Sequence, residues 1–67
     1  MEMLCERLKE KRKRANLTQE KVAQILGISR STYAYYETGK NEPDLKALIK
    51  LADLYETSID YLTGRYN

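Results

Sequence analysis

The sequence has few of the residues on which much protein chemistry depends. Its 67 residues include no histidine, phenylalanine or tryptophan, and only one cysteine. One cysteine cannot form an internal disulfide, and the absence of histidine excludes four-ligand zinc chemistry and histidine-based acid–base catalysis. Cys5 is therefore interpreted as a small apolar side chain in a reducing cytosol, and no metal or other cofactor is predicted.

Long apolar segments are also missing. No run approaches the roughly 20 residues that a helix needs to cross a bilayer. The N-terminal stretch, MEMLCERLKEKRKR, is charged throughout and lacks the apolar core of a signal peptide. The sequence therefore predicts a cytoplasmic protein with no membrane partner.

Charge is unevenly distributed along the chain. Residues 1–40 carry nine lysines and arginines against five acidic residues, and residues 41–67 carry three against five. The two parts therefore have net charges of +4 and −2. A basic half suits a surface that faces phosphates, although uneven solvation of an ordinary domain gives the same pattern.

Apolar periodicity predicts helices and no strands. The predicted helices cover residues 2–15, 19–26, 30–38, 45–55 and 59–63. Four of them follow a residue that suits an N-cap, namely Thr18, Ser29, Asp44 and Ser58. The sequence thus predicts an all-α fold, with one compact five-helix domain over residues 1–67.

Each predicted helix has a face that we expect to be buried. In the fourth helix this face is the stripe Leu45, Leu48, Ile49, Ala52 and Tyr55. Elsewhere it consists of Leu4, Leu8, Val22, Ala23, Leu26, Tyr33, Tyr36, Ile59 and Leu62. Exposed tyrosines among cations would suit a stacking platform for single-stranded nucleic acid. The inward positions of Tyr33, Tyr36 and Tyr55 favour core packing instead.

The stretch from Leu17 to Lys40 is predicted to form two short helices with a tight turn at Gly27. Two helices joined by a short glycine-containing turn are typical of the DNA-binding helix-turn-helix, and the small Ala23 permits a close crossing. At about 100° per residue, the outward face of the second helix holds Ser31, Ala34, Tyr35 and Thr38, flanked by Arg30 and Thr32. Glu37 falls beside the inward face.

The sequence from Leu8 to Gly64 resembles the Cro/repressor helix-turn-helix family, also called the xenobiotic-response-element family. The resemblance rests on LTQ, the spacing of Ala23 and Gly27, YETGK, EPDL, and the run of Leu51, Ala52 and Leu54. It implies a lambda-repressor-like domain of five helices whose third helix enters the major groove of DNA.

The resemblance also implies roles for individual residues. The positions that match base-reading ones are Arg30, Ser31 and Tyr35, and Ala34 offers a methyl group for a thymine. The positions that match phosphate contacts are Gln19, Thr32, Lys40 and Asn41. The helix N-terminus at Gln19 independently favours an anion. Arg12 and Glu37 match a partly buried salt bridge, so Arg12 is interpreted as structural. Tyr33 departs from the family, where isoleucine or valine is usual.

Lys11 belongs to a run of four cations that extends to Arg14. Cations at the end of a helix complement its dipole, and they can equally contact phosphate. Lys11 is therefore a further candidate phosphate contact.

The predicted function is sequence-specific binding of double-stranded DNA by a transcriptional regulator, most simply a repressor. One small module has a small footprint, so a homodimer on a palindrome is expected, with half-sites about 34 Å apart. The remaining apolar or aromatic residues, Leu54, Tyr61 and Tyr66, are the candidate dimer patch. No small-molecule ligand is evident.

Two other classes of function fit the sequence less well. A protein-interaction module, antitoxin-like or anti-repressor, would use the same fold, but with acidic or apolar residues on the outward face of the third helix. Arg30, Ser31 and Thr38 do not fit that pattern. An enzyme is not predicted, because the sequence has no carboxylate pair, nucleophile–base pair or glycine-rich phosphate loop.

Overall fold

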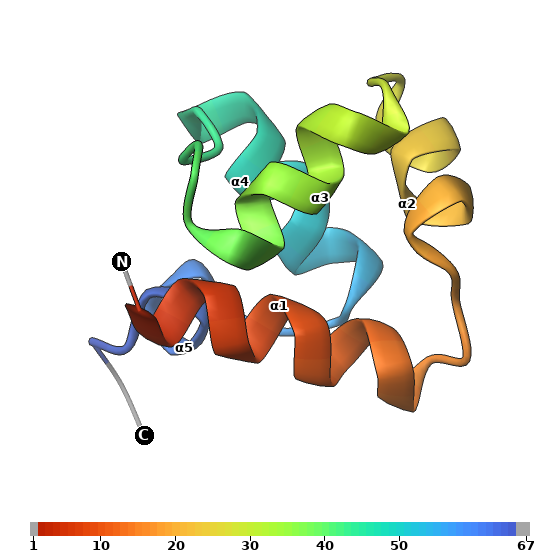
Figure 1. The fold of residues 1–67 in the computed structure, drawn as a ribbon. Coiled ribbons are helices and arrows are strands. Elements are labelled where there is room, and N and C mark those ends of the chain that lie inside the picture. Colours follow the sequence, from red (N-terminus) through yellow and green to blue (C-terminus); the bar gives the residue numbers. More distant parts are fainter. Residues whose placement is uncertain (1, 66–67) are drawn as a thin grey trace.

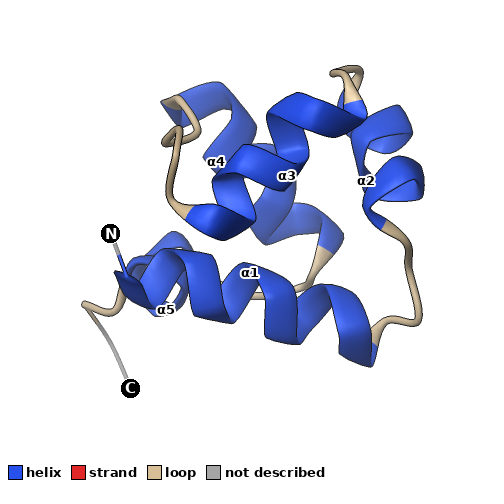
Figure 2. Cartoon of the chain, viewed as in Figure 1, coloured by secondary structure: helices blue, strands red, loops and turns tan. Residues whose placement is uncertain are grey.

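The computed structural model describes residues 2–65, which form five helices and no strand (Figure 2). The helices are α1 (Glu2–Arg14), α2 (Gln19–Leu26), α3 (Arg30–Thr38), α4 (Leu45–Leu54) and α5 (Ile59–Thr63). The predicted all-α fold of five helices is therefore confirmed. Over the described residues, no helix is both long enough and apolar enough to cross a membrane.

Side-chain caps determine where four of the helices begin. Thr18 accepts a hydrogen bond from the backbone N–H of Lys21, and Ser29 accepts one from that of Thr32. Asp44 caps α4 and Ser58 caps α5 in the same way. Each cap satisfies an amide that has no partner within its own helix.

The turn between α2 and α3 depends on Gly27. Its φ of 74° lies in the left-handed region, which glycine adopts without steric cost. The N–H of Gly27 bonds back to Gln24, and the N–H of Ile28 bonds to Ala23. The chain thus reverses within three residues, which brings α3 against α2.

In Figure 1, α1 runs along one side of the molecule with α5 beside its N-terminal half, and α2 and α3 lie on its other side. Side chains from all five helices meet in one core. Its buried members are Leu4, Leu8, Val22, Ala23, Leu26, Tyr33, Tyr36, Leu51, Ala52, Tyr55 and Leu62. The inward faces predicted for the first three helices are therefore buried.

The buried face of α4 differs from the predicted one. Leu45 and Ile49 were expected to point inward, but they are 67% and 46% exposed, whereas Leu51 is fully buried. Apolar residues surround more than half of this helix, so periodicity alone does not determine which side meets the core. Ala52 and Tyr55 are buried as predicted, and packing against α2 and α5 turns Leu51 inward in place of Leu45 and Ile49.

Two core tyrosines satisfy each other's hydroxyl groups. The hydroxyls of Tyr33 and Tyr55 lie 2.9 Å apart inside the core, and the rings of Tyr33 and Tyr36 meet edge to face at 6.2 Å. All three rings are buried. These tyrosines pack in the core and are not available to stack on a nucleic acid.

Candidate nucleic-acid interface

The two sides of α3 have opposite character. Tyr33, Tyr36 and Glu37 are buried against the scaffold. The outer face of α3 consists of Arg30, Ser31, Ala34, Tyr35 and Thr38, all of them exposed except the half-buried Ala34. With Lys40 in the following loop, this side carries two cations and no acidic side chain. Its charge and polarity suit an anionic, polar partner.

Glu37 attaches α3 to α1 through a salt bridge with Arg12. Its carboxylate accepts hydrogen bonds from Arg12 Nε at 2.7 Å and from Arg12 Nη2 at 3.2 Å. The remaining guanidinium nitrogen of Arg12 donates to the carbonyl of Leu17 at 2.9 Å. The structure thus brings together the two residues implied to form a salt bridge, and it adds an anchor to the loop before α2.

The ionisation of Glu37 follows from this environment. Burial raises the pKa of Glu37, but the hydrogen bonds from Arg12, Tyr33 and Gln19 and the positive charge of Arg12 outweigh burial. The pKa therefore lies below the usual value for glutamate. The hydrogen bond to Glu37 likewise raises the pKa of Arg12. Both groups are charged at neutral pH, as a paired buried carboxylate requires.

Gln19 connects this buried pair to the outer face. Its Nε2 donates to Glu37 Oε1 at 3.1 Å, and its Oε1 accepts from Arg30 Nη1 at 3.4 Å. Because a carboxylate only accepts hydrogen bonds, Glu37 determines which way the Gln19 amide points. A continuous chain of contacts therefore runs from Arg12 and Glu37 through Gln19 to the guanidinium of Arg30.

The predicted phosphate contacts after α3 lie close to its outer face. The Nζ of Lys40 is 4.6 Å from the centre of the Tyr35 ring, a cation–π contact. The N–H of Asn41 donates to the carbonyl of Tyr35 at 3.3 Å. Lys40 and Asn41 are both exposed, so the loop presents them on the same side as Tyr35.

Thr32 lies at the start of α3. Its backbone N–H donates to the hydroxyl of Ser29 at 3.1 Å, and the two hydroxyls are 2.8 Å apart. The side chain is half-buried. The hydroxyl of Thr32 therefore takes part in the cap of the helix and remains at the edge of the outer face.

Lys11 is placed differently from the other phosphate candidates. Its Nζ lies 5.2 Å from the centre of the Tyr61 ring, on the α5 side of α1. The adjacent Arg12 points to α3 instead. The structure does not bring Lys11 together with Gln19 or Arg30, and the contact with Tyr61 favours a structural role for Lys11 itself.

Two residues of the predicted dimer patch, Leu54 and Tyr61, lie within the described part of the chain, and both are half-buried. Arg7 stacks over the Tyr61 ring at 4.1 Å and donates to its carbonyl, and the Tyr61 hydroxyl donates to Glu10 at 3.2 Å. Leu54 is half-buried against the core. Tyr66 lies outside the described residues. Tyr61 therefore serves to hold α5 on α1.

Two features of the site were not predicted from sequence. The bonds from Gln19 to Glu37 and from Tyr33 to Tyr55 join residues 18 and 22 positions apart. A partial indication was present, because a tyrosine assigned to a core needs a partner for its hydroxyl. Which residue supplies that partner depends on the packing of α3 against α4.

Comparison with known proteins places this geometry in a family. Residues 8–62 match the sequence model of a family described as Helix-turn-helix. The chain is 49% identical over 63 residues to the HTH-type transcriptional regulator AnsR of Bacillus subtilis. The matched segment covers 94% of the chain and 54% of AnsR. It is 46% identical over 61 residues to the cryptic phage CTXphi transcriptional repressor RstR of Vibrio cholerae, covering 91% of the chain and 54% of RstR.

A solved structure supports the same assignment. The P22 c2 repressor in complex with synthetic operator 9T superposes with a TM-score of 0.84 at 27% identity, covering 88% of this chain and 89% of that one. The chain spans about half the length of the curated relatives that it matches.

Proposed function

The chain belongs to the Cro/C1-type helix-turn-helix family, and from this premise we propose that it binds a specific sequence of double-stranded DNA and represses transcription. The observation that carries the proposal is the division of α3. Its inner side is locked to the scaffold by Glu37, and its outer side presents Arg30, Ser31 and Tyr35 to solvent. An exposed polar helix face on a rigid support is what reading a major groove requires.

In this proposal, contacts to phosphates fix the position of the protein on the duplex. The N-terminal amides of α2 attract one phosphate, with the second N–H of the Gln19 amide beside them. Thr32, Lys40 and Asn41 contact the backbone from the start and the end of α3. Lys11 stays outside this group because of its contact with Tyr61.

Base contacts then read the sequence. The guanidinium of Arg30 can donate two hydrogen bonds to O6 and N7 of a guanine, a contact that discriminates by about 1–3 kcal/mol. Gln19 and Glu37 limit the directions in which Arg30 points. Ser31 and Tyr35 read neighbouring base edges, and the methyl group of Ala34 contacts a thymine.

Affinity is proposed to come from two copies on a palindromic operator. A module of this size covers one half-site, and recognition helices one turn of DNA apart are separated by about 34 Å. A dimer that covers a promoter excludes polymerase, so repression follows from occupancy alone. The repressors among its relatives support this choice over activation.

In-vitro selection of DNA with the purified protein tests the proposal. The expected result is an enriched motif with two-fold symmetry. Recovery of no motif at low salt would overturn the proposal and favour the protein-interaction module.

Two variants then test the assigned residues on the selected operator. Arg30→Ala should relax the preference at one base position, whereas Gln19→Ala should weaken binding to all sequences to a similar extent. If both variants bind as the parent does, α3 is not the reading helix.

A further inference from the structure

The outer side of α4 carries an apolar pair that nothing in the described chain covers. Leu45 is 67% exposed and Ile49 is 46% exposed. They lie four residues apart, so they are neighbours on one side of the helix. The other exposed large apolar residues lie singly on three different helices, at Met3, Ile25 and Tyr35.

Charged side chains border this pair. Lys46, Lys50 and Asp53 are all exposed, and none of their side chains has a hydrogen bond or ion pair with another described residue. On a helix with about 100° per residue, Lys46 and Asp53 point in directions only about 20° apart, two turns from each other along the axis. One side of α4 therefore has a cation near its start, an anion near its end and Ile49 midway.

We propose that this side of α4, defined by Leu45, Lys46, Ile49 and Asp53, is where two copies of the chain meet. A two-fold axis beside Ile49 packs α4 antiparallel to α4 of the partner. Ile49 then meets its symmetry mate, and Lys46 of each copy faces Asp53 of the other. A surface with an apolar residue at its centre and opposite charges on either side of it complements itself across a two-fold axis.

The position of α4 suits two copies on one DNA site, a point that rests on the proposed function. The helix begins after the loop of Lys40 and Asn41, and its first turns lie beside Leu26 at the C-terminal end of α2, the end away from Gln19 (Figure 1). A second copy docked there leaves the N-terminus of α2 and the outer face of α3 uncovered. This contact replaces the predicted dimer patch, in which Tyr61 is held by α1.

The size of the surface determines how strong the contact is. A helix of 10 residues is about 15 Å long, and one side of it buries well under the roughly 800 Å² per partner of a stable complex. The dimer is therefore expected to be mostly dissociated in dilute solution. It is expected to form when two copies bind adjacent half-sites, which raises their local concentration.

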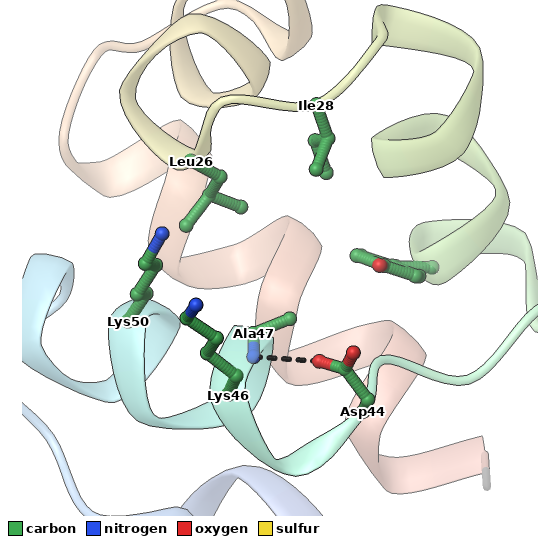
Figure 3. Close-up of a pocket in the computed structure, with 7 residues that line it drawn as sticks. Leu26, Ile28, Asp44, Lys46, Ala47 and Lys50 are labelled. Atoms are coloured by element: carbon green, nitrogen blue, oxygen red, sulfur yellow. Dashed lines mark hydrogen bonds between the residues drawn. The ribbon is translucent and has the colours of Figure 1, made fainter.

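A pocket beside this surface suggests an acidic peptide as an alternative partner. It measures about 170 Å³ and lies between Leu26, Ile28 and the first turns of α4, with Lys46 and Lys50 extending over it (Figure 3). An acidic peptide would suit the two lysines, but it would leave Leu45 and Asp53 without a role. Only a second copy accounts for the apolar pair and for both signs of charge.

Cross-linking tests the contact without DNA. In a Cys5→Ser background, Ile49→Cys at high protein concentration should give a disulfide-linked dimer under mild oxidation, because the two substituted positions meet across the axis. Ile25→Cys is the matched control, since Ile25 is exposed to the same degree, 48% against 46%. Equal cross-linking at the two positions would overturn the proposal, whatever the result of the DNA selection.

Binding to the selected operator tests the charge pairing. Lys46→Glu and Asp53→Lys should each reduce cooperative binding to two half-sites by about tenfold, and the double variant should recover most of the loss. Each measurement is repeated on a single half-site, where Asp53→Lys is expected to bind at least as well as the parent. Additive losses in the double variant would show that the two residues do not face each other, and would contradict the proposed register.

Discussion

The two sides of α3 differ in how their polar groups are satisfied. On the inner side, Glu37 has bonds to Arg12 and Gln19, and the Tyr33 hydroxyl is bonded to Tyr55. In the part of the chain that the structure describes, no buried side-chain nitrogen or oxygen lacks a partner. On the outer side, Arg30 has one long contact at 3.4 Å, to Gln19. The inner side of the helix therefore contributes most of its stability, and changes confined to the outer side are expected to cost little stability.

Removing the buried carboxylate should have the largest effect on stability. Glu37→Ala leaves Arg12, whose side chain is only 14% exposed, without its counter-charge. The free energy of unfolding should fall by about 3 kcal/mol, as measured by urea denaturation. Ser31→Ala on the outer side is the control, with an expected change within about 0.5 kcal/mol. Similar losses in the two variants would contradict the separation of the two sides.

Removing single hydroxyl groups gives a finer comparison. Tyr33→Phe leaves the buried hydroxyl of Tyr55 without its partner and removes the hydrogen bond from Tyr33 to Glu37, so it should cost about 1–2 kcal/mol of unfolding free energy. Tyr35→Phe removes the same group from the exposed side and should cost close to nothing. Thermal unfolding of the two variants measures the difference. An equal loss would mean that the hydroxyl pair in the core contributes no net stability.

Acid should weaken the inner side selectively. Because folding lowers the pKa of Glu37, its contribution is complete above the unfolded pKa of about 4.3 and is lost as the pH falls through the lower folded pKa. The free energy of unfolding should therefore decrease with falling pH below about 4.3, and less steeply in Glu37→Gln. Unfolding curves collected from pH 6 to pH 3 measure this difference. If the unfolding free energy depends on pH equally steeply in the parent and in Glu37→Gln, then Glu37 is not the source of the acid sensitivity.

The smallest effect on stability is expected at Arg30. Arg30→Ala should change the unfolding free energy by at most about 0.5 kcal/mol, although it removes about 1–3 kcal/mol of discrimination at one base pair. Denaturation and operator binding of the same preparation separate the two quantities. A large loss of stability would mean that the contact between Arg30 and Gln19 stabilises the fold in addition to orienting Arg30.

Local chemistry explains which parts of the fold could be predicted. The caps at Thr18, Ser29, Asp44 and Ser58 act within three residues, so their types and positions were enough to place the starts of the helices. The inward side of α3 was also predictable, since Tyr33 and Tyr36 are three residues apart and Ser31, Ala34 and Thr38 fall on the opposite side of the helix. These features depend on neighbours along the chain.

Features that depend on three-dimensional packing were not predictable to the same degree. In α4, apolar residues lie on both the core side and the solvent side, and only the contacts with α2 and α5 distinguish Leu51 from Ile49. The roles implied for Arg12 and Glu37 came from a resemblance to a family, whereas the bond from Glu37 to Gln19 emerged from the structure. The spacing of Gln19 and Glu37 along the sequence does not predict that bond.

The stacking of Tyr61 on Arg7 also bears on how the domain folds and opens. This contact joins residues 54 positions apart, so docking α5 on α1 closes most of the chain into a loop. The conformational entropy lost is therefore close to that of closing the whole chain. With only five residues of its own, α5 gains little stability before it docks. Its amides are therefore expected to exchange with solvent sooner than those of α3, and the last helix to dock in folding is expected to be the first to detach.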